Sequence, residues 1–245
     1  MEYMFLILLV LVLAYVLYRN FDLFSKFKNN KVYIECYKKM LNKEDDALQS
    51  IDEYINNSKK EESKNKGRIL RLYHLLDNNN DYIDSLNDID IKPIFCKNDK
   101  FNKDQFKLNT DVFVWLYMLL AKARSLSKFD IINELYVKLA SVPGIEEYVE
   151  YQLFKAIYNA VLEKEDGGVT FLTDMLEGKY TDYLYDKNMI GMFKRFAAST
   201  LAYCGEPVDD YYQEDIPKFA ATTIGKTYLK DLGIYDKYVI QEETE

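Results

Sequence analysis

One short amphipathic phrase recurs along the sequence and limits what the chain can fold into. Its clearest copy runs from Asn42 to Ile55, where apolar residues recur at helical spacing behind an acidic first turn. The position of Ala47 is taken in later copies, at intervals of 38, 47 and 40 residues, by Ser85, Ile132 and Leu172. Because a helix with one apolar face must bury that face against a neighbour, the recurrence predicts stacked helical hairpins.

Composition supports helices and limits the classes of partner. The chain has 22 Tyr and 14 Phe against only 9 Gly and 4 Pro, which favours helices over a β-sandwich. Its net charge of −8 argues against general nucleic-acid binding, which needs a basic surface. Cys36, Cys96 and Cys204 lie far apart, so we expect free thiols rather than a disulfide framework or a zinc site. The abundance of Asn, Lys, Ile and Tyr is typical of an AT-rich bacterial genome.

The apolar run from Tyr3 to Tyr18 predicts a membrane anchor over residues 1–20. It contains no charge and covers about 24 Å as a helix, slightly short of a bilayer core of about 30 Å. A signal peptide is the first alternative, but Glu2 stands where a basic region belongs and no small-residue cleavage site follows. A buried core helix is the second alternative, which would need apolar cover on every side. We therefore predict a single-pass transmembrane helix.

Flanking charge predicts the orientation of this anchor. Residues 19–43 hold seven basic and two acidic side chains, whereas Glu2 is the one charged side chain before the run. Because positive charge stays inside, the C-terminal domain is expected to be cytoplasmic, at the cell membrane. Residues 21–30 are predicted to form a basic juxtamembrane linker, which either rests on anionic lipid headgroups or is an ordinary solvated segment.

Residues 31–245 are predicted to form one helical-repeat domain. Trp115 is expected in the core of a central helix that Thr110 caps, and Pro217 in the first turn of the last helix. Residues 89–107 hold Pro93 and polar runs, so a connecting loop is expected there. Residues 58–66 are strongly charged and are expected to form an exposed helix start or a flexible link. The expected helices cover residues 31–41, 42–56, 68–76, a short stretch after the turn at 78–80, 111–125, 128–141, 145–162, 169–177, 182–203 and 216–232.

The recurring phrases resemble the second helix of tetratricopeptide repeats. Ala47 takes the small packing position and Ile51 the later aromatic one, while Ser85 matches in the second copy and Tyr136 in the third. The resemblance covers residues 31–177, although the first helices match poorly and the intervals exceed the usual 34 residues. It implies an α-α hairpin superhelix, a tetratricopeptide-like solenoid, so the predicted fold is all-α with a transmembrane helix before that array.

No residue pattern in the sequence predicts catalysis. His74 is the only histidine and has no identifiable nucleophile beside it, so a structural role is favoured. Gly167-Gly168 lacks the Lys-Ser/Thr pair of a phosphate-binding loop. The acidic pairs Asp209-Asp210 and Glu214-Asp215 lack the spacing of a calcium loop. We therefore predict no catalytic, cofactor-binding or metal-binding residue, and a protein that is not an enzyme.

These features favour a membrane-anchored cytoplasmic scaffold or adaptor that binds protein partners through a helical surface. From Glu165 onward the chain has sixteen acidic and eight basic residues, so a basic peptide or helix is the expected partner. Some of the tyrosines in that half are expected at the surface, where Tyr often anchors an interface. The alternatives are a helical enzyme or regulatory subunit, which a deep pocket lined by His74 or clustered carboxylates would favour, and an envelope-facing structural protein.

Overall fold

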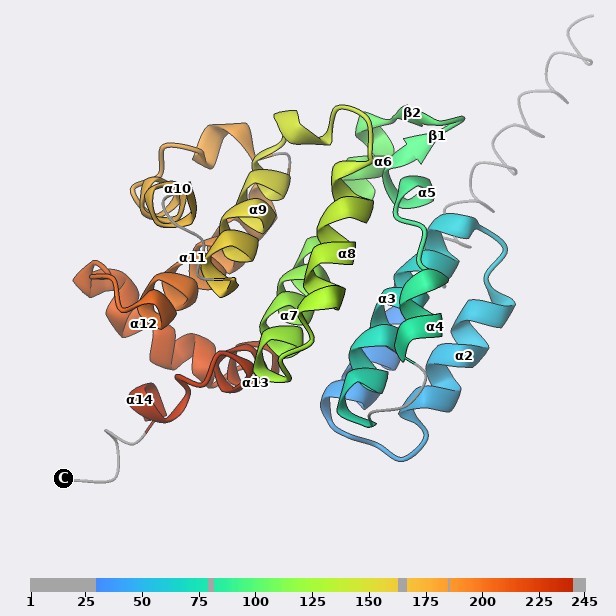
Figure 1. Cartoon of the computed structure of the whole chain (residues 1–245), viewed down its shortest axis with the longest axis horizontal. Helices are drawn as coiled ribbons and strands as arrows, with labels where there is room; N and C mark the ends of the chain where they lie inside the picture. The colour runs from blue at the N-terminus through green and yellow to red at the C-terminus, as the bar shows by residue number, and fades with distance from the viewer. Residues whose placement is uncertain (1–29, 79–81, 163–166, 185, 240–245) are drawn as a thin grey trace, which may run out of the picture.

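A computed structural model of the chain describes residues 30–78, 82–162, 167–184 and 186–239 (Figure 1). Helices make up most of these residues, so the all-α prediction is confirmed. The anchor predicted at residues 3–18 lies outside the described residues, as does nearly all of the linker. Among the residues that are described, no helix combines the length and the apolar character needed to cross a bilayer.

The N-terminal helices pack as antiparallel neighbours. Ala47 and Ile51 are fully buried where the second helix meets the third, as their apolar spacing predicts. The second helix was expected to start at Asn42, but residues 42–46 form a turn in which Lys43 has a left-handed φ of 57°. The elements are a helix over residues 30–41, α2 (Ala47–Asn57), α3 (Glu61–Leu75), the 3₁₀ turn η1 (Leu76–Asn78) and α4 (Tyr82–Asn87).

The expectation of a loop over residues 89–107 is wrong. This stretch folds because Phe95 and Phe106 are fully buried, with ring centroids 5.3 Å apart. Asn98 and Asp99 have φ values of 52° and 57°, so they form the two-residue turn of a hairpin without a glycine. The elements are α5 (Lys92–Phe95), β1 (Cys96–Lys97), β2 (Lys100–Phe101) and α6 (Lys103–Leu108).

Helix α7 (Val112–Ser125) is the centre of the molecule. Every residue from Val112 to Ala123 is buried, which confirms the prediction of a central helix with a broad apolar surface. Helices α3, α8, α9 and α13 pack against it from different sides (Figure 1). Helix α8 (Phe129–Ala140) follows as predicted, and the next expected helix is divided into the turn η2 (Ile145–Glu147) and α9 (Val149–Val161).

The C-terminal helices depart further from the predicted boundaries. The helix expected over 182–203 begins only at Ile190, and the helix expected over 216–232 is two helices. Pro217 lies inside the first of these, and the Thr222 hydroxyl starts the second by accepting from the Gly225 amide at 3.0 Å. The elements are α10 (Gly167–Leu176), η3 (Thr181–Tyr183), η4 (Lys187–Met189), α11 (Ile190–Cys204), α12 (Asp210–Ala220), α13 (Thr223–Asp231) and α14 (Asp236–Val239).

Helix α13 returns to the middle of the chain instead of lying at the end of a stack. It packs directly on α7, and Ile224 near its start faces the same space as Trp115. In a strictly linear array each repeat contacts only its neighbours. The return of α13 therefore closes the described helices around α7, and this closure differs from an open row of hairpins.

Candidate binding pocket beside the first described helix

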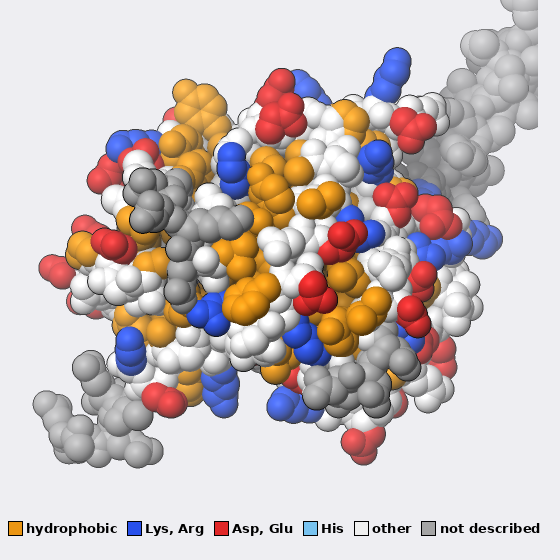
Figure 2. Space-filling view, viewed as in Figure 1, with side chains coloured by type: hydrophobic (Ala, Val, Ile, Leu, Met, Phe, Trp, Pro, Cys, Tyr) orange, Lys and Arg blue, Asp and Glu red, His pale blue; other side chains and the backbone are white. Residues whose placement is uncertain are grey.

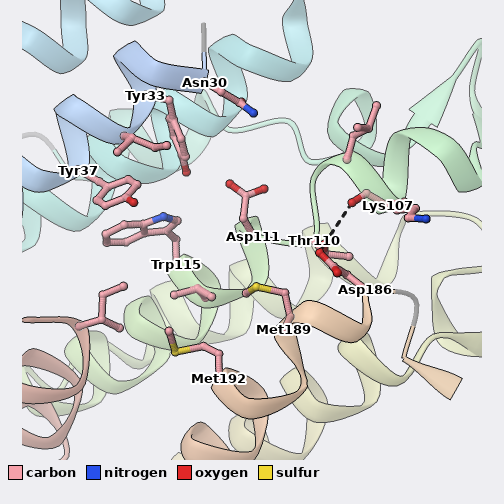
Figure 3. Close-up of a pocket in the computed structure, with 14 residues that line it drawn as sticks. Asn30, Tyr33, Tyr37, Lys107, Thr110, Asp111, Trp115, Asp186, Met189 and Met192 are labelled. Atoms are coloured by element: carbon pink, nitrogen blue, oxygen red, sulfur yellow. Dashed lines mark hydrogen bonds between the residues drawn. The ribbon is translucent and has the colours of Figure 1, made fainter. Parts of the chain in front are cut away.

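A pocket of about 390 Å³ lies where the helix over residues 30–41, the start of α7 and the start of α11 meet (Figure 3). This volume is in the range of small-molecule and side-chain binding sites. Its walls come from segments that are more than 150 residues apart in the sequence, so only the tertiary fold assembles it. The lining residues are Asn30, Tyr33, Ile34, Tyr37, Lys107, Leu108, Thr110, Asp111, Val114, Trp115, Asp186, Met189, Met192 and Ile224.

One wall of the pocket is apolar and is built around Trp115. This side chain is only 3% exposed, which confirms its predicted place in the core. Its ring lies 5.4 Å from that of Tyr37 and 5.9 Å from that of Tyr73, measured between centroids. Met189 and Met192 continue the wall from the α11 side (Figure 3). Aromatic and thioether groups together give a surface that adapts to an apolar ligand group.

Asp111, one turn before Trp115 at the start of α7, gives the pocket a negative charge that is held by a buried lysine. The Lys66 ammonium donates to both carboxylate oxygens of Asp111, at 2.9 and 3.0 Å. Lys66 is 5% exposed and lies 4.6 Å from the ring centroid of Tyr33. The Asp111 side chain is 44% exposed, so its carboxylate stays open to the pocket. Lys66 ends the segment that was expected to be an exposed helix start or a flexible link. A helix does start there, since α3 begins at Glu61, but the expected exposure of Lys66 is wrong because α3 buries it.

Tyr33 brings a buried hydroxyl without a partner to the pocket. The side chain is 2% exposed, and within the described part of the chain its hydroxyl makes no hydrogen bond. The hydroxyl points from the first described helix toward the interior of the pocket (Figure 3). Burial, helped by the negative charge of Asp111, raises the pKa of Tyr33 well above its ordinary value, so the hydroxyl stays protonated. A buried hydroxyl without a hydrogen-bond partner favours a ligand that supplies a polar group to bond with it.

Asp186 adds a second carboxylate at the side of the pocket near Thr110. One of its oxygens accepts from the Asn188 amide at 3.0 Å, and the other lies 3.5 Å from the Thr110 hydroxyl. Thr110 was expected to cap α7, but its hydroxyl donates to the Lys107 carbonyl at 3.3 Å, and α7 begins at Val112. The cap prediction is therefore wrong, because the preceding turn already occupies that hydroxyl.

The mouth of the pocket carries exposed apolar side chains. Ile34 is 38% and Leu108 is 64% exposed, although both are large aliphatic residues. Both belong to the lining of the pocket. Figure 2 shows that apolar side chains also reach the surface on the face viewed there, mixed with acidic and basic ones. Exposed apolar side chains at the mouth of a pocket mark a surface that a binding partner can cover.

The histidine and the acidic pairs that the sequence analysis weighed as chemical groups are not in the lining of this pocket. His74 is half-buried on α3, and burial together with the Lys122 charge lowers its pKa, so its imidazole is neutral at pH 7. Asp209 accepts from the Tyr211 amide at 2.9 Å at the start of α12, while Asp215 accepts from Arg195 at 2.7 Å. The described residues contain no cluster of side chains that could hold a metal ion. Sequence reasoning missed Asp111 and Asp186 as pocket residues, and Lys66 as the partner of Asp111.

The tyrosines of the C-terminal half divide between core and surface. Tyr151 and Tyr158 are buried, whereas Tyr183 is 72% and Tyr211 is 66% exposed. The prediction that some of them reach the surface is confirmed. Tyr185 lies outside the described residues. Burial raises the pKa of Cys36 to about 11 and its thiol donates to the Ser50 carbonyl at 3.3 Å, so this cysteine is a core residue without thiolate chemistry at neutral pH.

Comparison with known proteins adds no relative: no protein family, no curated protein and no solved structure matches this chain. The pocket and the packing around α7 therefore carry the functional argument.

Proposed function

We propose that this protein is a membrane-anchored cytoplasmic adaptor that binds a protein partner in the pocket beside its first described helix. The observation that carries the proposal is the apolar rim of Ile34 and Leu108 leading to a pocket with Trp115 in its wall. Large aliphatic side chains at a pocket mouth are stabilised when a partner covers them. The tetratricopeptide-like hairpin superhelix remains part of this proposal, as the scaffold that presents the rim.

The position of the pocket fits a partner at the membrane. Asn30 lines the pocket, and the apolar run of the predicted anchor ends twelve residues earlier, at Tyr18. Twelve residues reach at most about 40 Å when extended, so an anchored chain would hold the pocket within that distance of the bilayer. A cytoplasmic orientation follows from the basic residues after the anchor. The partner would therefore be a membrane protein or a protein recruited to the membrane.

We favour binding over catalysis because the carboxylates of the pocket already accept hydrogen bonds, and no nucleophile in its lining has a general base beside it. His74 is not in the lining. The two carboxylates that are, Asp111 and Asp186, accept from the Lys66 ammonium and from the Asn188 amide. These contacts orient the carboxylates for recognition of a charge. They do not form a nucleophile with an adjacent general base.

Site-specific photocrosslinking in the native membrane tests the adaptor proposal. A benzophenone amino acid at Leu108 is expected to capture a discrete partner, and the same residue at Val137 is the matched control. Val137 is a 60% exposed aliphatic residue on α8 that does not line the pocket. Equal capture from both positions, or none from Leu108, would contradict the proposal. A fluorescent reporter fused after Glu245 tests the orientation, and a periplasmic or extracellular position would overturn it.

A further inference from the structure

The pocket is amphipathic in one direction, from an apolar wall to an acidic end. Trp115 and Met192 lie toward one end of the pocket, Asp186 lies toward the other end, and the Asp111 carboxylate and the Tyr33 hydroxyl lie between them (Figure 3). Lysine and arginine side chains have the same division, with an aliphatic stem and a charged head. The shape and the chemistry of the pocket therefore fit one long basic side chain.

We propose that the pocket receives a single lysine or arginine side chain of the partner segment, an inference that rests on the adaptor function proposed above. The aliphatic stem lies along Trp115 and Met192. The cationic head reaches the Asp111 carboxylate and the Tyr33 hydroxyl. The residues that flank the basic one are apolar and cover Ile34 and Leu108 at the mouth.

The charges that face the pocket leave room for one cation. Asp111 and Asp186 are acidic, and Lys107 is the basic residue in the lining. Its ammonium group points away from Asp111 (Figure 3). Lys66, behind the wall, neutralises part of the charge of Asp111, but each carboxylate oxygen can accept more than one hydrogen bond. Lys66 and Lys107 match the two carboxylates in number, so a bound cation gains from the exposed oxygens of Asp111 and not from an excess of negative charge.

The Tyr33 hydroxyl is the reason why the bound group should be a hydrogen-bond donor within the pocket. Its oxygen is buried and accepts from no described group, so an incoming N–H gains a hydrogen bond there once the side chains packed over the hydroxyl move aside. The ring faces of Tyr37 and Trp115 add an attraction for a cation that passes close to them. An apolar ligand group would leave the hydroxyl without a hydrogen bond, and an anionic group would be repelled by the two carboxylates.

Fluorescence of the full-length chain in lipid nanodiscs reports on this pocket directly. The chain has a single tryptophan, Trp115, and it lies in the pocket wall. The probe is a blocked Leu-Arg-Leu peptide, with a Leu-citrulline-Leu peptide as its neutral isostere. We expect a saturable change in Trp115 emission with the arginine peptide, and binding about tenfold weaker or worse with the citrulline peptide.

Three substitutions assign the effect to named groups. Tyr33→Phe removes only the hydroxyl and Asp186→Asn only a charge, and each is expected to weaken binding about three- to tenfold. Asp182→Asn is the matched control, because Asp182 is an acid on the neighbouring turn whose side chain is 91% exposed and outside the pocket lining. These variants avoid Asp111, whose neutralisation would leave buried Lys66 without a counter-charge and destabilise the fold.

Each remaining outcome overturns the inference. Equal affinity for the arginine and citrulline peptides would exclude recognition of a cation. Equal affinity for butylguanidine and the arginine peptide would make this a small-cation site rather than a site for a protein segment. If no peptide produces a saturable change while Leu108 still crosslinks to a partner, the adaptor function stands and the basic-side-chain inference fails. Loss of both results would reject the proposed function as well.

Discussion

The hydroxyl of Tyr73 on α3 donates a 3.0 Å hydrogen bond to the carboxylate of Asp231 at the end of α13. The two residues are 158 positions apart in the chain. Their contact lies next to the packing of α13 on α7, so it fastens the last large helix to the N-terminal hairpins. Lys122 of α7 is part of the same cluster, with its ammonium 4.0 Å from the Tyr73 ring centroid and 2.8 Å from Asp77.

The first prediction concerns the pH dependence of this cluster. Burial raises the pKa of Asp231 from 3.8 to about 6, against the smaller lowering effect of Lys122. Between these values the folded chain binds a proton that the unfolded chain has lost, so the stabilisation from Asp231 is full below about pH 4 and lost as pH rises through 6. The shift corresponds to about 3 kcal/mol at most.

Asp231→Asn tests this sign, because the amide oxygen still accepts from Tyr73 but cannot ionise. We expect the variant to gain stability relative to the natural protein as pH rises from 4 to 7. The measurement is urea unfolding of the full chain in mild detergent at several pH values, followed by far-UV circular dichroism. A difference between the two proteins that stays constant over this range would contradict the assignment.

The second prediction uses two buried tyrosines with opposite surroundings. Tyr33→Phe removes a hydroxyl without a partner, so the free protein is expected to gain about 1 kcal/mol of unfolding free energy. Tyr228→Phe removes a hydroxyl that lies 2.9 Å from the Thr200 hydroxyl, so a loss of about 1 kcal/mol is expected. Denaturant unfolding of both variants gives the signs, and a loss from Tyr33→Phe would show that its hydroxyl is already satisfied.

The third prediction concerns the close approach of α13 to α12. A Cβ atom on Gly225 would lie 2.0 Å from the Phe219 carbonyl oxygen, which is backbone and cannot move aside alone. Gly225→Ala is therefore expected to cost about 1–3 kcal/mol or more. Gly191 is the control, since it lies in α11 with no atom within 4 Å of an added Cβ. Gly191→Ala should stabilise the helix by about 0.5–1 kcal/mol, and thermal unfolding compares the two.

The fourth prediction separates packing from binding at Trp115. Truncation to Ala removes a buried ring that packs against Tyr37 and Tyr73, so a loss of about 3–5 kcal/mol is expected. Tyr183→Ala, at a 72% exposed aromatic side chain, should change stability by less than about 0.5 kcal/mol. Circular dichroism is the readout because the variant lacks tryptophan. Unchanged stability with lost partner crosslinking would make Trp115 a binding anchor instead of a core residue.

The sequence was most informative where one helix face buries itself against a neighbour. Residues 128–141 and the broad apolar surface around Trp115 predicted α8 and α7, since period and burial agree there. The hairpin at Asn98-Asp99 was not predicted because its left-handed turn contains no glycine. The division between α12 and α13 was not predicted because the apolar spacing continues across it. Local pattern cannot distinguish these cases from a loop or from one longer helix.

The pocket could not be predicted from the sequence for a different reason. Tyr33, Asp111 and Asp186 meet only after helices from three parts of the chain have packed. Lys66 looked like part of a solvated charge run, and its burial depends on the fold bringing it to Asp111. Residue spacing cannot predict that the Tyr33 hydroxyl lacks a hydrogen-bond partner, because this depends on the groups that the fold places around it.

The return of α13 to α7 has a consequence for synthesis on the ribosome. Helix α7 ends at Ser125, but the last helix to pack against it is α13, which ends at Asp231. At translation rates of about 5–20 residues per second, the nascent chain carries α7 with one side uncovered for roughly 5–20 s. During that interval the uncovered side of α7 can aggregate, so a chaperone would have its greatest effect then.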